Sequence, residues 1–90
     1  MQLYLICADL RPQREYERLS NELRRYGAVR ALDCGWWLER DGVTCASLRD
    51  HFSQFIEVED RMVVARLAEW AGRWVKATPS DDAAKPQRAR

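Results

Sequence analysis

The stretch LYLICADL, residues 3–10, decides the fold. Every residue in it except Asp9 is apolar, and it contains neither glycine nor proline. A short, continuously apolar run of this kind is typical of a strand that is buried on both faces of a sheet. Arg11 and Pro12 follow directly, and proline cannot donate the backbone hydrogen bond that a central strand requires. The sequence therefore predicts a central strand over residues 3–10.

A helix is predicted over residues 15–26, directly after this strand. Its large apolar side chains recur at the spacing that places them on one stripe of a helix: Tyr16, Leu19, Leu23 and Tyr26. Gly27 follows the stripe, and glycine is the residue that most often ends a helix in the left-handed conformation. We therefore expect the helix to stop at Gly27.

A second helix is predicted over residues 45–56, with Thr44 as its N-cap, because a threonine side chain accepts hydrogen bonds from the first turn. Its apolar stripe consists of Cys45, Leu48, Phe52 and Phe55.

Residues 29–32 and 35–39 are predicted to form two short strands, or one strand with a kink at Asp33 and Cys34, and residues 61–67 a further strand. Trp36 and Trp37 lie next to each other within residues 35–39. Because successive side chains of a strand point to opposite faces, one of these indoles is expected to face the helices and the other to face away.

The predicted order of elements is strand, helix, two short strands, helix, strand. This order predicts an α+β, ferredoxin-like βαββαβ sandwich, in which an antiparallel sheet carries both helices on one face. The single domain covers residues 1–77. Residues 78–90 hold no large apolar side chain and are predicted to be a disordered C-terminal tail. Residues 68–75 fit a short strand, a turn or a docking arm.

The second face of this sheet has no helix to cover it, although the strand residues on that face are apolar as well. A sheet-to-sheet or edge-to-edge contact with a second copy would bury such a face. The sequence therefore predicts a homodimer.

Composition excludes several classes of protein. The chain has 15 basic and 14 acidic residues, so it is not a strongly basic nucleic-acid binder. No apolar run approaches the length of a membrane span, and the first residues do not resemble a signal peptide, so we expect no membrane association and a cytoplasmic location. The three cysteines, Cys7, Cys34 and Cys45, are too far apart for a zinc motif and are interpreted as reduced thiols that pack as small apolar groups.

The order and spacing of these segments resemble the small CRISPR-associated family called Cas-two, and especially its stand-alone SinR-like group. The resemblance covers roughly residues 1–75. The segments that carry it are LICADL at 5–10, LRRYGAV at 23–29, GWWL at 35–38 and EDRMVV at 59–64.

This resemblance implies a ferredoxin-like homodimer. Some members of the family are metal-dependent nucleases that act on RNA or DNA, and others form the non-catalytic central dimer of a larger spacer-integration complex. The matching functional position is Asp9, which the resemblance implies to be catalytic and to bind Mg²⁺ or Mn²⁺ together with the Asp9 of a second copy. Arg11 and Pro12 stand where the family usually has another acidic residue, and Leu38 stands where it often has a glutamate.

Each candidate residue also has a structural interpretation. Asp9 either binds metal or accepts hydrogen bonds in the turn that follows it. Asp33 either joins Asp9 or serves a turn. His51 is either a general acid–base group or an exposed helical histidine without a partner.

The arginines Arg11, Arg14, Arg18 and Arg25 are candidates for binding the phosphates of a nucleic acid, or form an ordinary solvated helix face with nearby glutamates. The four tryptophans either stack on bases or belong to the core and the dimer interface. Three functions therefore remain open: a metal-dependent nuclease, a non-catalytic homodimeric scaffold or interaction module, and a small ligand-binding domain.

Overall fold

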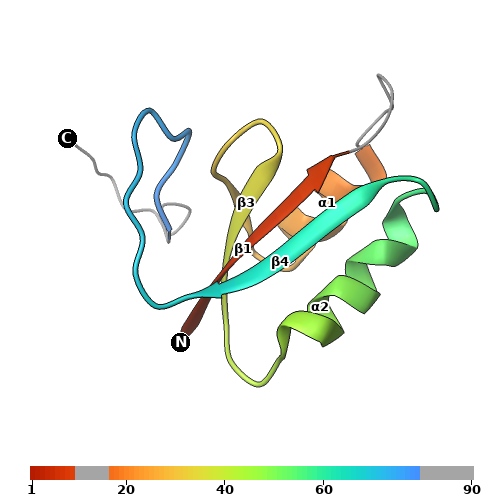
Figure 1. Ribbon diagram of the computed structural model, residues 1–90, viewed down its shortest axis with the longest axis horizontal. Helices are drawn as coiled ribbons and strands as arrows, with labels where there is room; N and C mark the ends of the chain where they lie inside the picture. Colours follow the sequence, from red (N-terminus) through yellow and green to blue (C-terminus); the bar gives the residue numbers. More distant parts are fainter. Residues whose placement is uncertain (10–16, 80–90) are drawn as a thin grey trace.

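One antiparallel sheet of four strands, in the order β2-β3-β1-β4, organises the molecule (Figure 1). The computed structural model describes residues 1–9 and 17–79. The strands are β1 (Gln2–Asp9), β2 (Val29–Arg30), β3 (Gly35–Arg40) and β4 (Arg61–Leu67). The predicted strands are thereby confirmed, although β2 is only two residues long. Two helices complete a small α+β architecture that is compatible with the predicted ferredoxin-like fold.

β1 is a central strand, as its continuously apolar sequence predicts. It pairs with β3 on one side and β4 on the other, so that Ile6 lies opposite both Trp36 and Val64. Tyr4 and Ile6 are buried on the helix side of the sheet, while Leu5 is half-buried on the other side.

α1 (Glu17–Arg25) ends where the sequence predicts. Gly27 adopts a φ of 91°, and the backbone N–H of Ala28 donates to the carbonyl of Leu23 while that of Gly27 donates to Arg24. This pair of bonds is the Schellman arrangement, which favours glycine because a side chain at positive φ is strained. The first two residues of the predicted helix lie outside the described part of the chain.

α2 (Cys45–Phe52) begins at the predicted cap. The Thr44 hydroxyl accepts a hydrogen bond from the Ser47 backbone, and the Ser47 hydroxyl accepts one from the Thr44 backbone. The prediction that this helix continues to Ile56 is wrong, because residues Ser53–Phe55 form a 3₁₀ turn, η1. The backbone becomes extended at Ile56, directly after this 3₁₀ turn, and the chain then runs back into β4.

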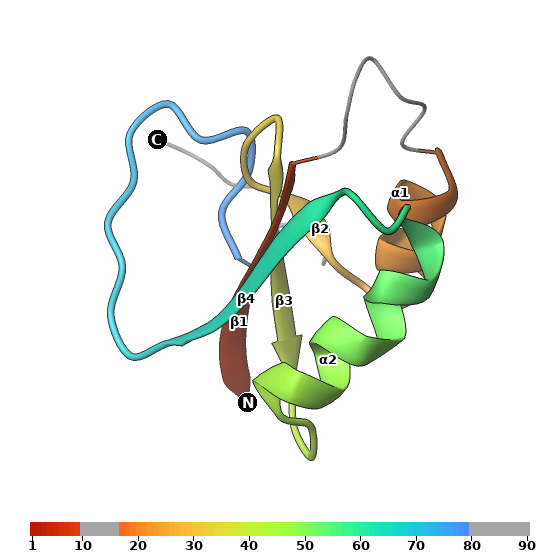
Figure 2. The same cartoon turned by 45° about the vertical axis from the view of Figure 1, so that its right-hand side comes forward.

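Both helices lie on one face of the sheet (Figure 2). The core fills the space between these two layers. Its buried members are Tyr4, Ile6, Leu19, Leu23, Ala28, Trp36, Leu38, Leu48 and Phe52. Trp36 belongs to this core and Trp37 does not, so the two indoles face opposite sides of the sheet as predicted. Neither helix in the described ranges is long and apolar enough to cross a bilayer.

The second face of the sheet is half covered by the chain itself, which corrects the expectation that it is uncovered. Residues 68–79, here called the strap, run back across this face (Figure 2). The Trp70 ring packs against Trp37 at 4.5 Å between centroids, and the Trp37 indole N–H donates to the carbonyl of Ala77 at 2.6 Å. The backbone N–H of Lys76 donates to the carbonyl of Ala31. The docking-arm alternative for residues 68–75 is therefore the one that the structure adopts, and Trp37 is buried.

Candidate functional site

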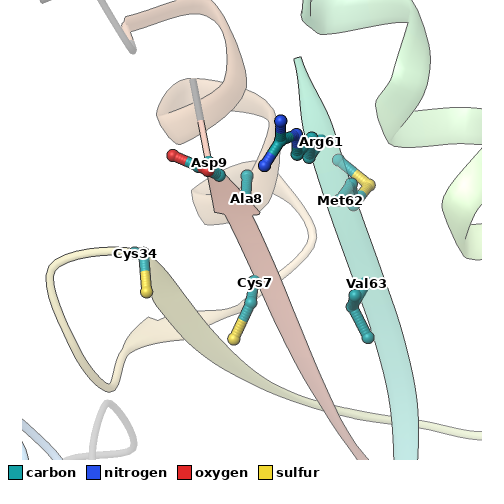
Figure 3. Close-up of a pocket in the computed structure, with 7 residues that line it drawn as sticks. All are labelled: Cys7, Ala8, Asp9, Cys34, Arg61, Met62 and Val63. Carbon is teal, nitrogen blue, oxygen red and sulfur yellow. The ribbon is translucent and has the colours of Figure 1, made fainter. Parts of the chain in front are cut away.

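Asp9 lies at the exposed end of β1, on the part of the sheet that the strap does not cover. In the β1–β4 register it stands directly opposite Arg61. A concavity of about 350 Å³ adjoins it, lined by Cys7, Ala8, Asp9, Cys34, Arg61, Met62 and Val63 (Figure 3). The Asp9 carboxylate points away from β4 in this view. The predicted catalytic residue is thus accessible from solvent beside an open hollow.

The donor set at this hollow contains one carboxylate. Within residues 1–9 and 17–79, no group of three or more His, Cys, Asp or Glu side chains lies close enough to hold a metal ion. Asp33 is no part of the set, because its carboxylate is exposed and pairs with the ammonium group of Lys76 at 3.3 Å. A magnesium ion in a protein typically uses one or two carboxylates with water and substrate phosphates. At this hollow, one copy of the chain therefore supplies a single carboxylate.

Two thiols flank the same hollow. Cys7 and Cys34 are both free thiols. Burial raises the pKa of the Cys7 thiol, and the neighbouring Cys34 raises it further. A raised pKa keeps this thiol protonated at neutral pH, which fits the interpretation of Cys7 as a small apolar group.

The arginines that the sequence singles out do not form one cluster among the described residues. Arg18 donates to the carbonyl of Gln54, and its guanidinium lies 5.7 Å from the centre of the Phe55 ring. Arg25 forms a bidentate ion pair with Glu22, at 2.9 and 2.7 Å. Arg18 and Arg25 therefore both have partners within the protein.

The other two predicted phosphate-binding residues, Arg11 and Arg14, lie outside the described residues. The structure instead brings together Arg24 and Arg30, which sequence reasoning did not select. Both guanidinium groups lie over the ring of Trp36, and no sequence spacing signals this arrangement.

His51 has a partner that the sequence does not reveal. Its Nε2 donates to a carboxylate oxygen of Glu22 at 2.6 Å, which joins α2 to α1. The His51 ring also packs against Tyr26, with 4.9 Å between centroids. The interpretation of His51 as an exposed histidine without a partner is therefore wrong. Because Glu22 accepts from both His51 and Arg25, this group links the two helices rather than presenting a free base.

We expect acid to weaken this link. Hydrogen bonds from Arg25 and then His51 lower the pKa of Glu22 from 4.5 to about 2. Because the folded pKa lies below the unfolded one, the stabilising contribution is complete above pH 4.5 and is lost as the pH falls towards 2. Thermal melts of the wild type should show this loss, and Glu22→Gln should show a flatter pH profile between pH 4.5 and 2. Parallel profiles for the two proteins would contradict the expectation.

No protein-family model and no solved structure matches this chain.

Proposed function

We propose that this chain is a Cas-two-like, ferredoxin-like domain that acts on nucleic acid as a homodimer, with Mg²⁺- or Mn²⁺-dependent cleavage of phosphodiester bonds at paired Asp9 residues. The observation that supports it best is the position of Asp9 at the open end of the central strand, beside a hollow of about 350 Å³. A carboxylate at this position is accessible to metal and to a phosphodiester at the same time.

The sheet order supports the proposed fold. In a βαββαβ chain whose two βαβ halves interleave, the first and third strands occupy the middle of an antiparallel sheet. Here β1 and β3 are the inner strands, and β2 and β4 are the edges. The two helices follow β1 and β3, as this topology requires.

The uncovered half of the second face supports the proposed homodimer. Val63 on the edge strand β4 is 65% exposed, which is unusual for a valine in the middle of a strand. Among the described residues no strand pairs with the outer edge of β4, which is the last strand of the sheet, so this edge can pair with another strand. Asp9 adjoins this surface, because in the β1–β4 register it stands opposite Arg61, the first residue of β4. A dimer formed on this side of the sheet would lie beside Asp9, and the proposal requires that the two Asp9 carboxylates face each other across it.

The chemistry that the residues would supply follows from this pairing. Two Asp9 carboxylates would provide the anionic oxygens for one divalent ion, and water and a substrate phosphate would complete its coordination. A bound divalent ion neutralises charge on the phosphate and makes a coordinated water more acidic. Without a cation, two facing carboxylates repel each other, so a bound metal ion would stabilise the dimer.

Asp9→Asn should strongly reduce the proposed activity. We expect the wild type to cleave single-stranded RNA or DNA in millimolar Mn²⁺, and Asp9→Asn to reduce the rate by about 100-fold, because a ligand of the metal is lost. Asp41→Asn is a matched control, since Asp41 is an exposed carboxylate in the turn after β3, 3.8 Å from the amino terminus.

Thermal melts and light scattering provide the second readout of the same variants. Mn²⁺ should stabilise the wild type and the Asp41→Asn control, because a ligand that binds only the folded state raises its stability, and should not stabilise Asp9→Asn. Light scattering should give the mass of a dimer. An unchanged melting temperature in Mn²⁺, together with no cleavage, would refute the metal-dependent activity.

A non-catalytic homodimeric scaffold or interaction module is the second candidate. It is favoured by the single carboxylate at the hollow and by the basic Arg61 that stands opposite Asp9. On this alternative the wild type would bind nucleic acid or a protein partner without metal, and Asp9→Asn would bind equally well. The cleavage assay and a binding assay with the same two proteins distinguish the candidates.

A further inference from the structure

A second hollow lies at the opposite edge of the sheet from Asp9, between the end of α1 and the edge strand β2. Its volume is about 400 Å³. It is lined by Arg24, Gly27, Ala28, Val29, Arg30 and Trp36. Apart from the two arginines, its walls offer only backbone, small side chains and an indole, so the guanidinium groups supply its charge.

Trp36 holds both guanidinium groups in place. The central carbon of the Arg30 guanidinium lies 4.4 Å from the centre of the indole ring, and that of Arg24 lies 5.3 Å from it. Trp36 is only 5% exposed and belongs to the core, so the ring itself is fixed. Cation–π contact with a fixed ring reduces the conformational entropy that an arginine loses on binding a ligand.

Neither guanidinium is neutralised by a carboxylate of the described residues. Arg24 makes its described contact with the indole alone, whereas its neighbour Arg25 is paired with Glu22. Arg30 donates one hydrogen bond, from Nη1 to the backbone carbonyl of Asp33. The Nε of Arg30 is buried and has no hydrogen-bond partner within residues 1–9 and 17–79.

Two unpaired cations that share one ring repel each other, and a buried donor without a partner costs free energy. An anion with several acceptor oxygens that binds in the hollow would lower this repulsion and accept hydrogen bonds from the accessible nitrogens of both arginines. The planar donor fork of arginine matches the oxygens of a phosphate, and stacking on an indole leaves the edge of the fork free to donate.

We propose that Arg24 and Arg30 form a phosphate-binding site at the edge of β2, and that the phosphates belong to the backbone of a nucleic acid. The choice of a nucleic acid rests on the function proposed above, while the phosphate chemistry rests on the hollow itself. Because Trp36 is buried beneath the two guanidinium groups, bases cannot stack on it, and the site recognises backbone without reading sequence. A free phosphate or diphosphate offers the same chemistry, and the experiment separates the two sources.

The test measures binding of a fluorescein-labelled single-stranded oligonucleotide by fluorescence anisotropy, in parallel with inorganic phosphate and diphosphate by calorimetry. The variants are Arg24→Gln, Arg30→Gln and the double variant. Arg66→Gln is the matched control, because Arg66 lies on the opposite edge strand, is exposed, and donates only to the side chain of Gln2. Arg24 is exposed, so Arg24→Gln keeps the test valid if replacement of the half-buried Arg30 disturbs folding.

Each single variant should weaken oligonucleotide binding about tenfold, the loss expected for one charged hydrogen bond, and Arg66→Gln should stay within about twofold. The double variant should also lower the slope of log affinity against log salt concentration by about 1.4, since each phosphate contact on a single strand contributes about 0.7. These results would support the site.

Other results would overturn it in distinguishable ways. Wild-type affinity and salt slope in the double variant would refute this site and leave nucleic-acid binding to other residues. Binding of phosphate or diphosphate alone, lost in the double variant, would support the phosphate site and refute the nucleic-acid function. Binding of neither ligand by the wild type would refute both.

Discussion

Phe52→Ala is expected to lower the free energy of unfolding by about 4 kcal/mol, the usual cost of truncating a fully buried phenylalanine. The Phe52 side chain is completely buried, and its ring packs edge-on against Tyr26 at 5.1 Å. Truncation would leave a cavity at the point where α2, the end of α1 and the sheet meet. Because a domain of this size has a total stability of about 5–10 kcal/mol, much of it would be lost.

Urea denaturation followed by circular dichroism measures this loss. Val58→Ala is the control, because Val58 is 95% exposed in the connection before β4 and its truncation should change stability by less than about 0.5 kcal/mol. A cost below about 1 kcal/mol for Phe52→Ala would mean that α2 does not pack on the sheet as described.

Removal of the strap by truncation after Leu67 is expected to cost about 3 kcal/mol. Trp37 is 5% exposed with the strap in place, and truncation would remove Trp70 and return the Trp37 indole to water. Burial of one large side chain contributes about 1.5–3 kcal/mol, and the hydrogen bond from Trp37 to Ala77 contributes about 1 kcal/mol more.

Truncation after Pro79 is the matched control for this experiment. It removes residues 80–90 and leaves every described contact of the strap intact, so its melting temperature should equal that of the full chain. Urea denaturation followed by circular dichroism measures the stability of both truncated proteins and of the full chain. Equal stability of the two truncated proteins would show that the strap does not hold this face of the sheet.

Local sequence signals predicted most of the elements and one of the candidate sites. The periodicity of Leu19 and Leu23 placed α1, Gly27 ended it, and Thr44 capped α2, because each of these signals acts within a few residues of the chain. The apolar run before Asp9 placed that carboxylate at the end of a central strand. The same local reasoning missed the break in α2 at Ser53, since the return of the chain to β4 is set by the sheet.

The sequence by itself determined which segments are helices and strands, and that Trp36 and Trp37 face opposite sides of the sheet, because the 3.6- and 2-residue periods are properties of the local backbone. Only the tertiary structure decided which distant groups meet. The register of packed elements brings His51 to Glu22, 29 residues away, and folds the strap back onto Trp37. It also places Arg24 and Arg30 over one indole, because α1 ends beside the edge strand β2, and this juxtaposition depends on packing that no local pattern encodes.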